Sequence, residues 1–63
     1  MLTRDVCGRF AWYRVSVSPA AVGAFRVTVA HYDGDRLVPA LDHCERARSA
    51  GALFRTYCDL YAS

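Results

Sequence analysis

The sequence predicts a small α+β fold, in which an antiparallel β-hairpin or three-stranded meander is covered on one face by a C-terminal amphipathic helix. Three observations carry this prediction. Residues 10–32 hold two alternating runs of β-type residues, a sharp turn signal follows at Asp33-Gly34-Asp35, and the last third of the chain repeats apolar residues at helical spacing. With 63 residues the chain is long enough for one domain at most, 1–63, and a chain of this size buries only about 60% of its unfolded surface.

The two runs, 10–18 and 24–32, are rich in the aromatic and β-branched residues that fit a half-buried sheet. The segment 19–23 between them holds a proline and a glycine, which are typical of a turn. Since side chains alternate along a strand, each run has one apolar set, which we expect on a common face. These sets are Tyr13, Val15 and Val17 in the first run, and Phe25, Val27 and Val29 in the second. The expected register pairs Val17 with Phe25, Val15 with Val27 and Tyr13 with Val29.

The opposite face of the hairpin has an unusual composition for a surface in contact with solvent. It carries Phe10, Trp12, Arg14, Ser16, Arg26, Thr28, Ala30 and Tyr32. Three aromatic residues therefore lie among two arginines, on a face that the helix leaves open. An open aromatic face on so short a chain indicates a binding partner.

The turn at Asp33-Gly34-Asp35 predicts a third strand over residues 36–41, because an Asp-Gly dipeptide favours a two-residue type I′ turn between paired strands. Pro39 lies within this segment and cannot donate to a ladder, so we expect the strand at the edge of the sheet. A rival interpretation starts a long helix at Pro39, which gives a ββα fold with a longer helix. We favour the third strand.

The helix is predicted over residues 45–62, with Asp42 as its N-cap and Glu45 completing a capping box. Gly51 falls on the apolar side, so we expect it to pack closely on the sheet. The apolar side consists of Ala47, Ala50, Gly51, Phe54, Tyr57, Cys58 and Tyr61, flanked by Leu53 and Leu60. Residues 1–9 are interpreted as a short polar lead-in before the first strand.

The composition narrows the classes of function. The eight basic residues are all arginine and the net charge is only +2, which is less basic than a typical nucleic-acid-binding module. Arginine suits phosphate and carboxylate recognition, but a GC-rich genome explains the same bias without a functional meaning. No apolar run is long enough to span a membrane and no signal-peptide core is visible, so we expect a cytoplasmic protein with no membrane partner.

The three cysteines, Cys7, Cys44 and Cys58, are an odd number and predict no disulfide framework. We expect Cys44 and Cys58 to be buried as small hydrophobes. With His31 and His43 these cysteines are the candidate zinc ligands, but none stand at a metal-binding spacing. Asp33 and Asp35 lack the loop of a calcium site. We therefore expect no metal and no cofactor.

Cys44 stands between His43 and Glu45, which resembles a catalytic set only along the chain. Neighbouring residues point in different directions, and catalytic triads are assembled from separate elements. A chain of 63 residues is also too short to wall off a pocket alone. We therefore expect no catalytic residues and no enzyme activity.

The candidate partner-binding residues are Phe10, Trp12, Arg14, Arg26 and Tyr32. Tryptophan, tyrosine and arginine are the usual anchors of protein interfaces, so a protein partner is favoured. The same set would stack unpaired bases and contact phosphates, which makes a small nucleic-acid-binding module the alternative. A homodimer that covers this face is the third option.

Taken together, these features favour a non-catalytic interaction module, most readily a protein-binding inhibitor or regulator of the phage or mobile-element type, such as an inhibitor of a host defence complex. This inference rests on architecture alone. The DNA-binding arms of some integrases have a similar outline of three strands and one helix, although no motif of theirs is present. That similarity supports the nucleic-acid alternative.

Overall fold

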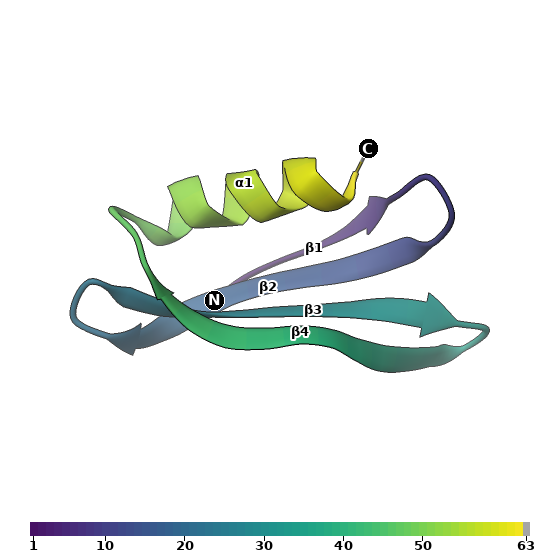
Figure 1. Cartoon of the computed structure of the whole chain (residues 1–63), viewed down its shortest axis with the longest axis horizontal. Coiled ribbons are helices and arrows are strands. Elements are labelled where there is room, and N and C mark those ends of the chain that lie inside the picture. Colours follow the sequence, from purple (N-terminus) through teal and green to yellow (C-terminus); the bar gives the residue numbers. More distant parts are fainter. Residues whose placement is uncertain (63) are drawn as a thin grey trace.

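The computed structural model describes residues 1–62 and shows a four-stranded antiparallel sheet with one helix lying over it (Figure 1). The elements are β1 (Leu2–Cys7), β2 (Trp12–Ala21), β3 (Ala24–Asp33), β4 (Arg36–Arg46) and α1 (Ala50–Tyr61). The strands lie in chain order, and each pairs with the next. The predicted α+β class and C-terminal helix are confirmed, but the sheet has one strand more than the predicted meander.

The additional strand is β1, so the prediction of a lead-in over residues 1–9 was wrong. β1 pairs with β2 along its whole length, from Leu2 opposite Val17 to Cys7 opposite Trp12. Only Val6 is buried. A strand at the edge of a sheet with one open face needs few apolar residues, which explains why its polar sequence concealed it.

The expected register between the two central strands was wrong by two residues. Val17 lies opposite Val27 and Val15 opposite Val29, whereas Phe25 pairs with Pro19. β2 continues through Pro19 as far as Ala21, with a bulge on the way, and the connection shrinks to two residues. Because the shift is even, both apolar sets keep the predicted face.

Both tight turns place a glycine at positive φ. Gly23 has a φ of 73° in the β2–β3 turn and Gly34 a φ of 63° in the β3–β4 turn. Asp33 pairs with Arg36, so the central residues are Gly34 and Asp35, and among the described residues no non-glycine has a positive φ. The β3–β4 turn therefore has the type II′ pattern, with glycine first, and not the predicted type I′.

The third predicted strand is confirmed as β4, and the rival helix from Pro39 was wrong. β4 lies at the edge of the sheet, as the proline required. Its register with β3 shifts where Val29 faces Leu41 and Ala30 faces Pro39, so Ala40 is the extra residue of a bulge. Beyond the bulge β4 continues without interruption to Arg46.

The helix begins later than predicted. Glu45 belongs to β4, and Asp42 is not a cap. The N-cap is Ser49, whose hydroxyl accepts a hydrogen bond from the amide of Ala52 at 3.1 Å. Serine is a preferred N-cap because its oxygen satisfies an amide that has no partner within the helix.

The core lies between α1 and one face of the sheet, as predicted. Its buried residues are Val6, Val15, Val17, Val27, Val29, Leu53, Phe54 and Cys58. Tyr13 and Phe25 are half-buried and pack against this cluster. Leu53, which was predicted on the flank of the apolar side, is one of the three buried residues of α1, with Phe54 and Cys58.

Two expectations about small residues at this interface were wrong. Gly51 is exposed, and a Cβ placed on it would meet nothing within 4 Å. The close approach is made by Gly8 instead, where a Cβ would lie 2.7 Å from the carbonyl oxygen of Tyr61 and 2.8 Å from the Tyr13 ring. Cys58 is buried as expected, but Cys44 is exposed because its strand position faces away from the helix.

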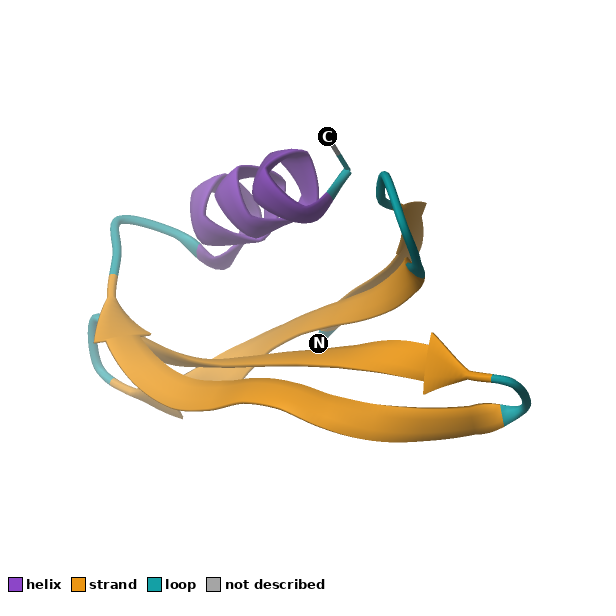
Figure 2. Ribbon diagram, turned by 45° about the vertical axis from the view of Figure 1, so that its right-hand side comes forward, coloured by secondary structure: helices purple, strands orange, loops and turns teal. Residues whose placement is uncertain are grey.

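Figure 2 shows that α1 covers one side of the sheet only, with the β3–β4 hairpin extending beyond it. The contacts of the helix are made chiefly with β1 and β2. The other side of the sheet is not covered by any element within residues 1–62. This uncovered side is called the open face below.

Candidate functional site

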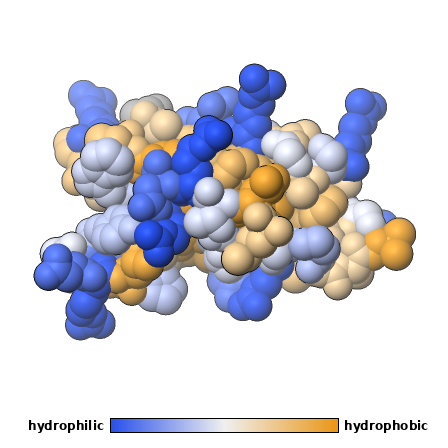
Figure 3. Space-filling view, turned by 180° about the vertical axis from the view of Figure 1, so that it is seen from behind, coloured by the Kyte–Doolittle hydropathy of each residue, from blue (hydrophilic) through white to orange (hydrophobic). Residues whose placement is uncertain are grey.

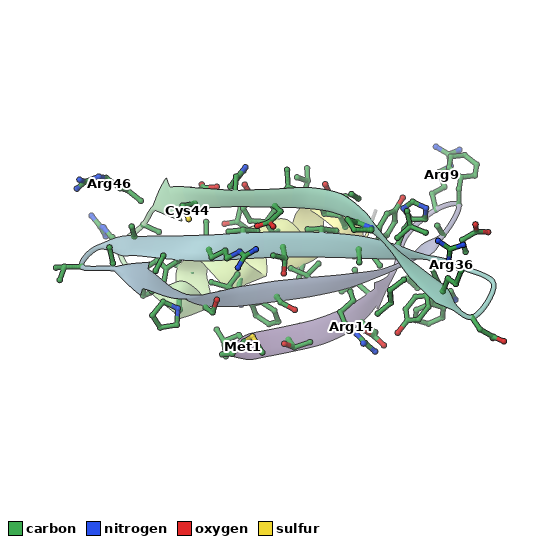
Figure 4. The ribbon with its side chains drawn as sticks, turned by 90° about the horizontal axis from the view of Figure 1, so that it is seen from below. Met1, Arg9, Arg14, Arg36, Cys44 and Arg46 are labelled. Carbon is green, nitrogen blue, oxygen red and sulfur yellow. The ribbon has the colours of Figure 1, made fainter. Side chains whose placement is uncertain are left out.

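The open face is built from alternate residues of all four strands, and Figure 4 views it directly. The registers place on it Thr3, Asp5, Cys7, Trp12, Arg14, Ser16, Ser18, Arg26, Thr28, Ala30, Tyr32, Leu37, Pro39, Asp42 and Cys44. Four of the five predicted partner-binding residues belong to this face. The exception is Phe10, which lies in the β1–β2 loop and is 91% exposed.

Arg14 is the centre of a three-strand polar cluster with Asp5 of β1 and Tyr32 of β3. Its Nε lies 2.9 Å from Oδ1 of Asp5, and its Nη2 donates to Oδ2 of Asp5 at 3.3 Å and to the Tyr32 hydroxyl at 2.7 Å. The same hydroxyl donates to Oδ2 of Asp5 at 3.0 Å. The hydrogen bond from Arg14 holds the pKa of Asp5 below its usual value, and partial burial raises the pKa of the Tyr32 phenol.

Arg26 uses the same two nitrogens with which Arg14 binds Asp5, Nε and Nη2, to pair with Asp42 of β4. Its Nε lies 2.9 Å from Oδ1 and its Nη2 lies 2.7 Å from Oδ2 of that carboxylate. The bidentate bond lowers the pKa of Asp42 and raises the pKa of Arg26. Both predicted arginines are thus neutralised within the protein.

Sequence reasoning missed both carboxylates for a specific reason. Asp5 lay in the supposed lead-in and Asp42 in the supposed helix cap, so neither was placed on the sheet. The available signal was the alternation of Thr3, Asp5 and Cys7 against Arg4 and Val6, which has the period of a strand.

A row of larger side chains crosses the same end of the open face. Cys7 pairs with Trp12, and Tyr32 pairs with Leu37. Continuing the β2–β3 register by one residue from Tyr13 opposite His31 brings Trp12 to Tyr32. We call these four residues the open-face row. Trp12 is 55% exposed and Leu37 is 39% exposed, so the row presents apolar surface beside the neutralised cluster of Arg14.

A second polar cluster lies on the helix side of β4, and sequence reasoning missed it. Nε2 of His43 lies 2.9 Å from Oε2 of Glu45 and 3.0 Å from the hydroxyl of Tyr57. The Tyr57 hydroxyl donates to the same Glu45 oxygen at 2.5 Å and thereby links α1 to β4. This bond lowers the pKa of Glu45 and, with some burial, raises the pKa of Tyr57 to about 12.

The structure separates the three neighbours that resembled a catalytic set. His43 and Glu45 bond to each other on the helix side, whereas Cys44 lies on the open face opposite Arg26. Burial raises the pKa of the third thiol, Cys58, which leaves it less nucleophilic. Within residues 1–62 no three His, Cys, Asp or Glu side chains gather as metal ligands.

A shallow hollow of about 470 Å³ lies between α1 and β1, away from the open face. Its lining consists of Arg4, Gly51, Phe54, Arg55, Cys58 and Asp59. The Arg4 guanidinium lies 5.5 Å from the Phe54 ring centroid and covers this core residue. The arginine that lines this hollow therefore already packs against the core through a cation–π contact with Phe54.

Other exposed apolar side chains do not form a comparable row. Figure 3 shows the molecule from behind, with hydrophobic residues in the middle and toward both ends, and hydrophilic side chains projecting between them. Those more than half exposed come from four separate places, the N-terminus, the β1–β2 loop, the β2–β3 turn and the helix, and they are Met1, Phe10, Val22 and Leu60. No helix among the described residues has the length and apolar character needed to cross a membrane.

Comparisons with protein-family models, curated proteins and solved structures give no match.

Proposed function

We propose that the protein is a non-catalytic interaction module that binds another protein across the open-face row, and acts as an inhibitor or regulator of that partner. The observation that carries this proposal is the exposure of Trp12 and Leu37 in one row that spans all four strands. Tryptophan and tyrosine are the residues that most often anchor protein interfaces. Such a module would act by occupying the surface of its partner.

The size of the open face suits this role. The molecule has principal extents of 36 × 20 × 14 Å, so its broad face approaches the area of about 800 Å² that each partner contributes to a standard interface. The cluster of Asp5, Arg14 and Tyr32 beside the row is polar but internally satisfied. Such a cluster suits the polar rim of an interface whose centre is apolar.

The pairing of the arginines favours protein over nucleic acid. Phosphate contacts supply most of the affinity of nucleic-acid-binding proteins. Arg14 and Arg26 each place two nitrogens on a carboxylate of their own sheet, so binding a phosphate competes with an existing ion pair. Nucleic-acid binding is therefore the alternative outcome of the test below.

The test places a photo-crosslinking residue on the row and a matched one away from it. Benzoylphenylalanine replaces Trp12 in one variant and Val22, which is fully exposed in the β2–β3 turn, in the other. Irradiation in the cells that express the chain should give a discrete protein adduct from position 12 and none from position 22. Adducts from both positions, or from position 22 alone, would contradict the proposal.

Nuclease treatment and oligonucleotide binding distinguish a protein partner from a nucleic-acid partner. An adduct that nuclease removes, together with salt-sensitive binding of labelled single-stranded DNA that Arg14→Ala or Arg26→Ala weakens, would assign the face to nucleic acid. The proposal expects a nuclease-resistant adduct and no binding of the oligonucleotide at low salt.

A further inference from the structure

The outer side of β4 is an unpaired sheet edge whose sequence is complementary to itself. Among the described residues no strand pairs with this side, because β4 ends the strand order and α1 contacts chiefly β1 and β2. Figure 4 shows Cys44 and Arg46 together on this edge strand. Edge strands expose unpaired amides and carbonyls, which are templates for pairing with another strand.

One hydrogen bond establishes which backbone groups of β4 face outward. The amide of Ala47 donates to the carbonyl of Gly23 at 3.2 Å, so the amide of Ala47 points toward β3. The β3–β4 register is uninterrupted between Leu41 and Arg46. Because the direction alternates along a strand, the amides and carbonyls of Asp42, Cys44 and Arg46 point away from β3 and toward the free edge.

We propose that two copies of the chain pair antiparallel through residues 42–46 of β4, with Cys44 on the two-fold axis. In this register Asp42 lies opposite Arg46 of the other copy, and His43 lies opposite Glu45 of the other copy. All three outward-facing residues then meet outward-facing partners, which gives six backbone hydrogen bonds between the copies. The result is one continuous eight-stranded sheet.

Charge selects this register over its neighbours. If the pairing shifts by two residues in one direction, His43 lies opposite His43 of the other copy. If it shifts by two residues in the other direction, Glu45 lies opposite Glu45 of the other copy. Further shifts oppose Asp42 to Asp42 or Arg46 to Arg46. Like charges directly opposite each other are unfavourable in a sheet, whereas opposite charges stabilise it. The registers centred on Asp42, Glu45 and Arg46 therefore meet such repulsion, and the one centred on His43 opposes no pair of opposite charges. Only the register centred on Cys44 avoids opposed like charges and also places Asp42 opposite Arg46.

The side chains retain capacity for these contacts. Arg46 has no ion pair within residues 1–62, and Oε1 of Glu45 has no hydrogen bond there, since His43 and Tyr57 both use Oε2. Asp42 bonds to Arg26, but a carboxylate accepts about four hydrogen bonds. A two-fold axis perpendicular to the sheet also keeps both open faces on the same side. The dimer therefore presents two open-face rows, whatever each row binds.

The test compares two substitutions of the same residue. Cys44→Pro removes an outward amide that no intrachain bond uses, and proline is tolerated on the outer side of an edge strand. Cys44→Ala keeps that amide and serves as the matched control. In sedimentation equilibrium the wild type and Cys44→Ala should dimerise at concentrations between about 1 μM and 1 mM. Cys44→Pro should weaken dimerisation by roughly tenfold or more, because it removes two symmetric hydrogen bonds. Circular dichroism establishes that both variants fold.

A charge variant and a crosslink define the register. Arg46→Glu should weaken the dimer, whereas Arg48→Glu, which makes the same change of charge beyond the strand, should not. In a Cys7→Ser background, diamide should oxidise Cys44 of the two copies to one disulfide, each thiol losing a proton and an electron to diamide. Opposed residues about 5.5 Å apart at Cα lie within disulfide range. A wild-type chain that stays monomeric to about 1 mM, or a dimer that Cys44→Pro leaves unchanged, would overturn the proposal.

Discussion

The two faces of the sheet differ sharply although they alternate residue by residue. Val15 pairs with Val29 on the helix-covered face, and both are at most 1% exposed. The next pair along, Ser16 and Thr28, lies on the open face and remains half-buried. The covered face is held by apolar burial against α1, whereas the open face is held by ion pairs and hydrogen bonds between neighbouring strands.

This difference separates the residues that stabilise the fold from the residues to which we assign binding. Burial of apolar area is the main source of stability, so residues on the covered face carry most of it. Ion pairs exposed to solvent contribute little because water and salt screen them. The open face can therefore present Trp12 and Leu37 to a partner with only a small contribution to the fold.

The largest expected effect is on the covered face. Val27→Ala removes two buried methyl groups at a fully buried position and should lower the free energy of unfolding by about 2–3 kcal/mol. Thr28→Ala, one residue along and on the open face, should cost less than about 1 kcal/mol. Urea denaturation of both variants measures the contrast, and equal losses would show that the two faces do not differ as described.

Two glycines give a smaller and opposite pair of effects. Gly8→Ala forces a Cβ to within 2.7 Å of the Tyr61 carbonyl oxygen and should destabilise the protein by roughly 1–3 kcal/mol. Gly51→Ala lies in α1 in open space and should stabilise it by about 0.5–1 kcal/mol. Thermal unfolding of the two variants tests both signs. A stabilising Gly8→Ala would mean that the β1–β2 loop does not pack against the end of the helix.

The smallest effect concerns the link between α1 and β4. The pKa of Tyr57 is raised from 10.0 to about 12, so its phenol is protonated more tightly in the folded state. Its contribution to stability is therefore present in full below pH 10.0 and is lost as the pH rises to about 12. Ultraviolet titration of tyrosinate should show a late-ionising phenol that Tyr57→Phe removes. Glu45→Gln should return that phenol toward its ordinary pKa, and an unchanged titration in Glu45→Gln would exclude the carboxylate as the cause.

The elements with strong apolar alternation were predictable from the sequence. Val15, Val17, Val27 and Val29 identify the two central strands and their covered face, because burial on one side forces a period of two. The third strand followed from the glycine at the turn. The exact pairing was not predictable, because Pro19 lies within a bulged strand and not in the turn, and an even shift leaves the apolar pattern unchanged.

The polar elements were not predictable in the same way. β1 buries only Val6 and so carries almost no apolar signal. Asp42 and Glu45 have the spacing of a capping box, yet they belong to β4, where each bonds to a residue distant in sequence. Local patterns cannot distinguish a cap from a strand when tertiary contacts decide. Consequently Trp12, Arg14, Arg26 and Tyr32 were placed on the right face, but the carboxylates that neutralise the arginines were missed.

The separation of folding from binding is tested most directly by urea denaturation of Trp12→Ala. Trp12 is the large residue at the centre of the open-face row, and it is more than half exposed. If the covered face carries the fold, this variant should lose less than about 1 kcal/mol of stability, well below the loss in Val27→Ala. A loss as large as that of Val27→Ala would show that Trp12 belongs to the folding core, and would contradict its proposed role as a binding residue.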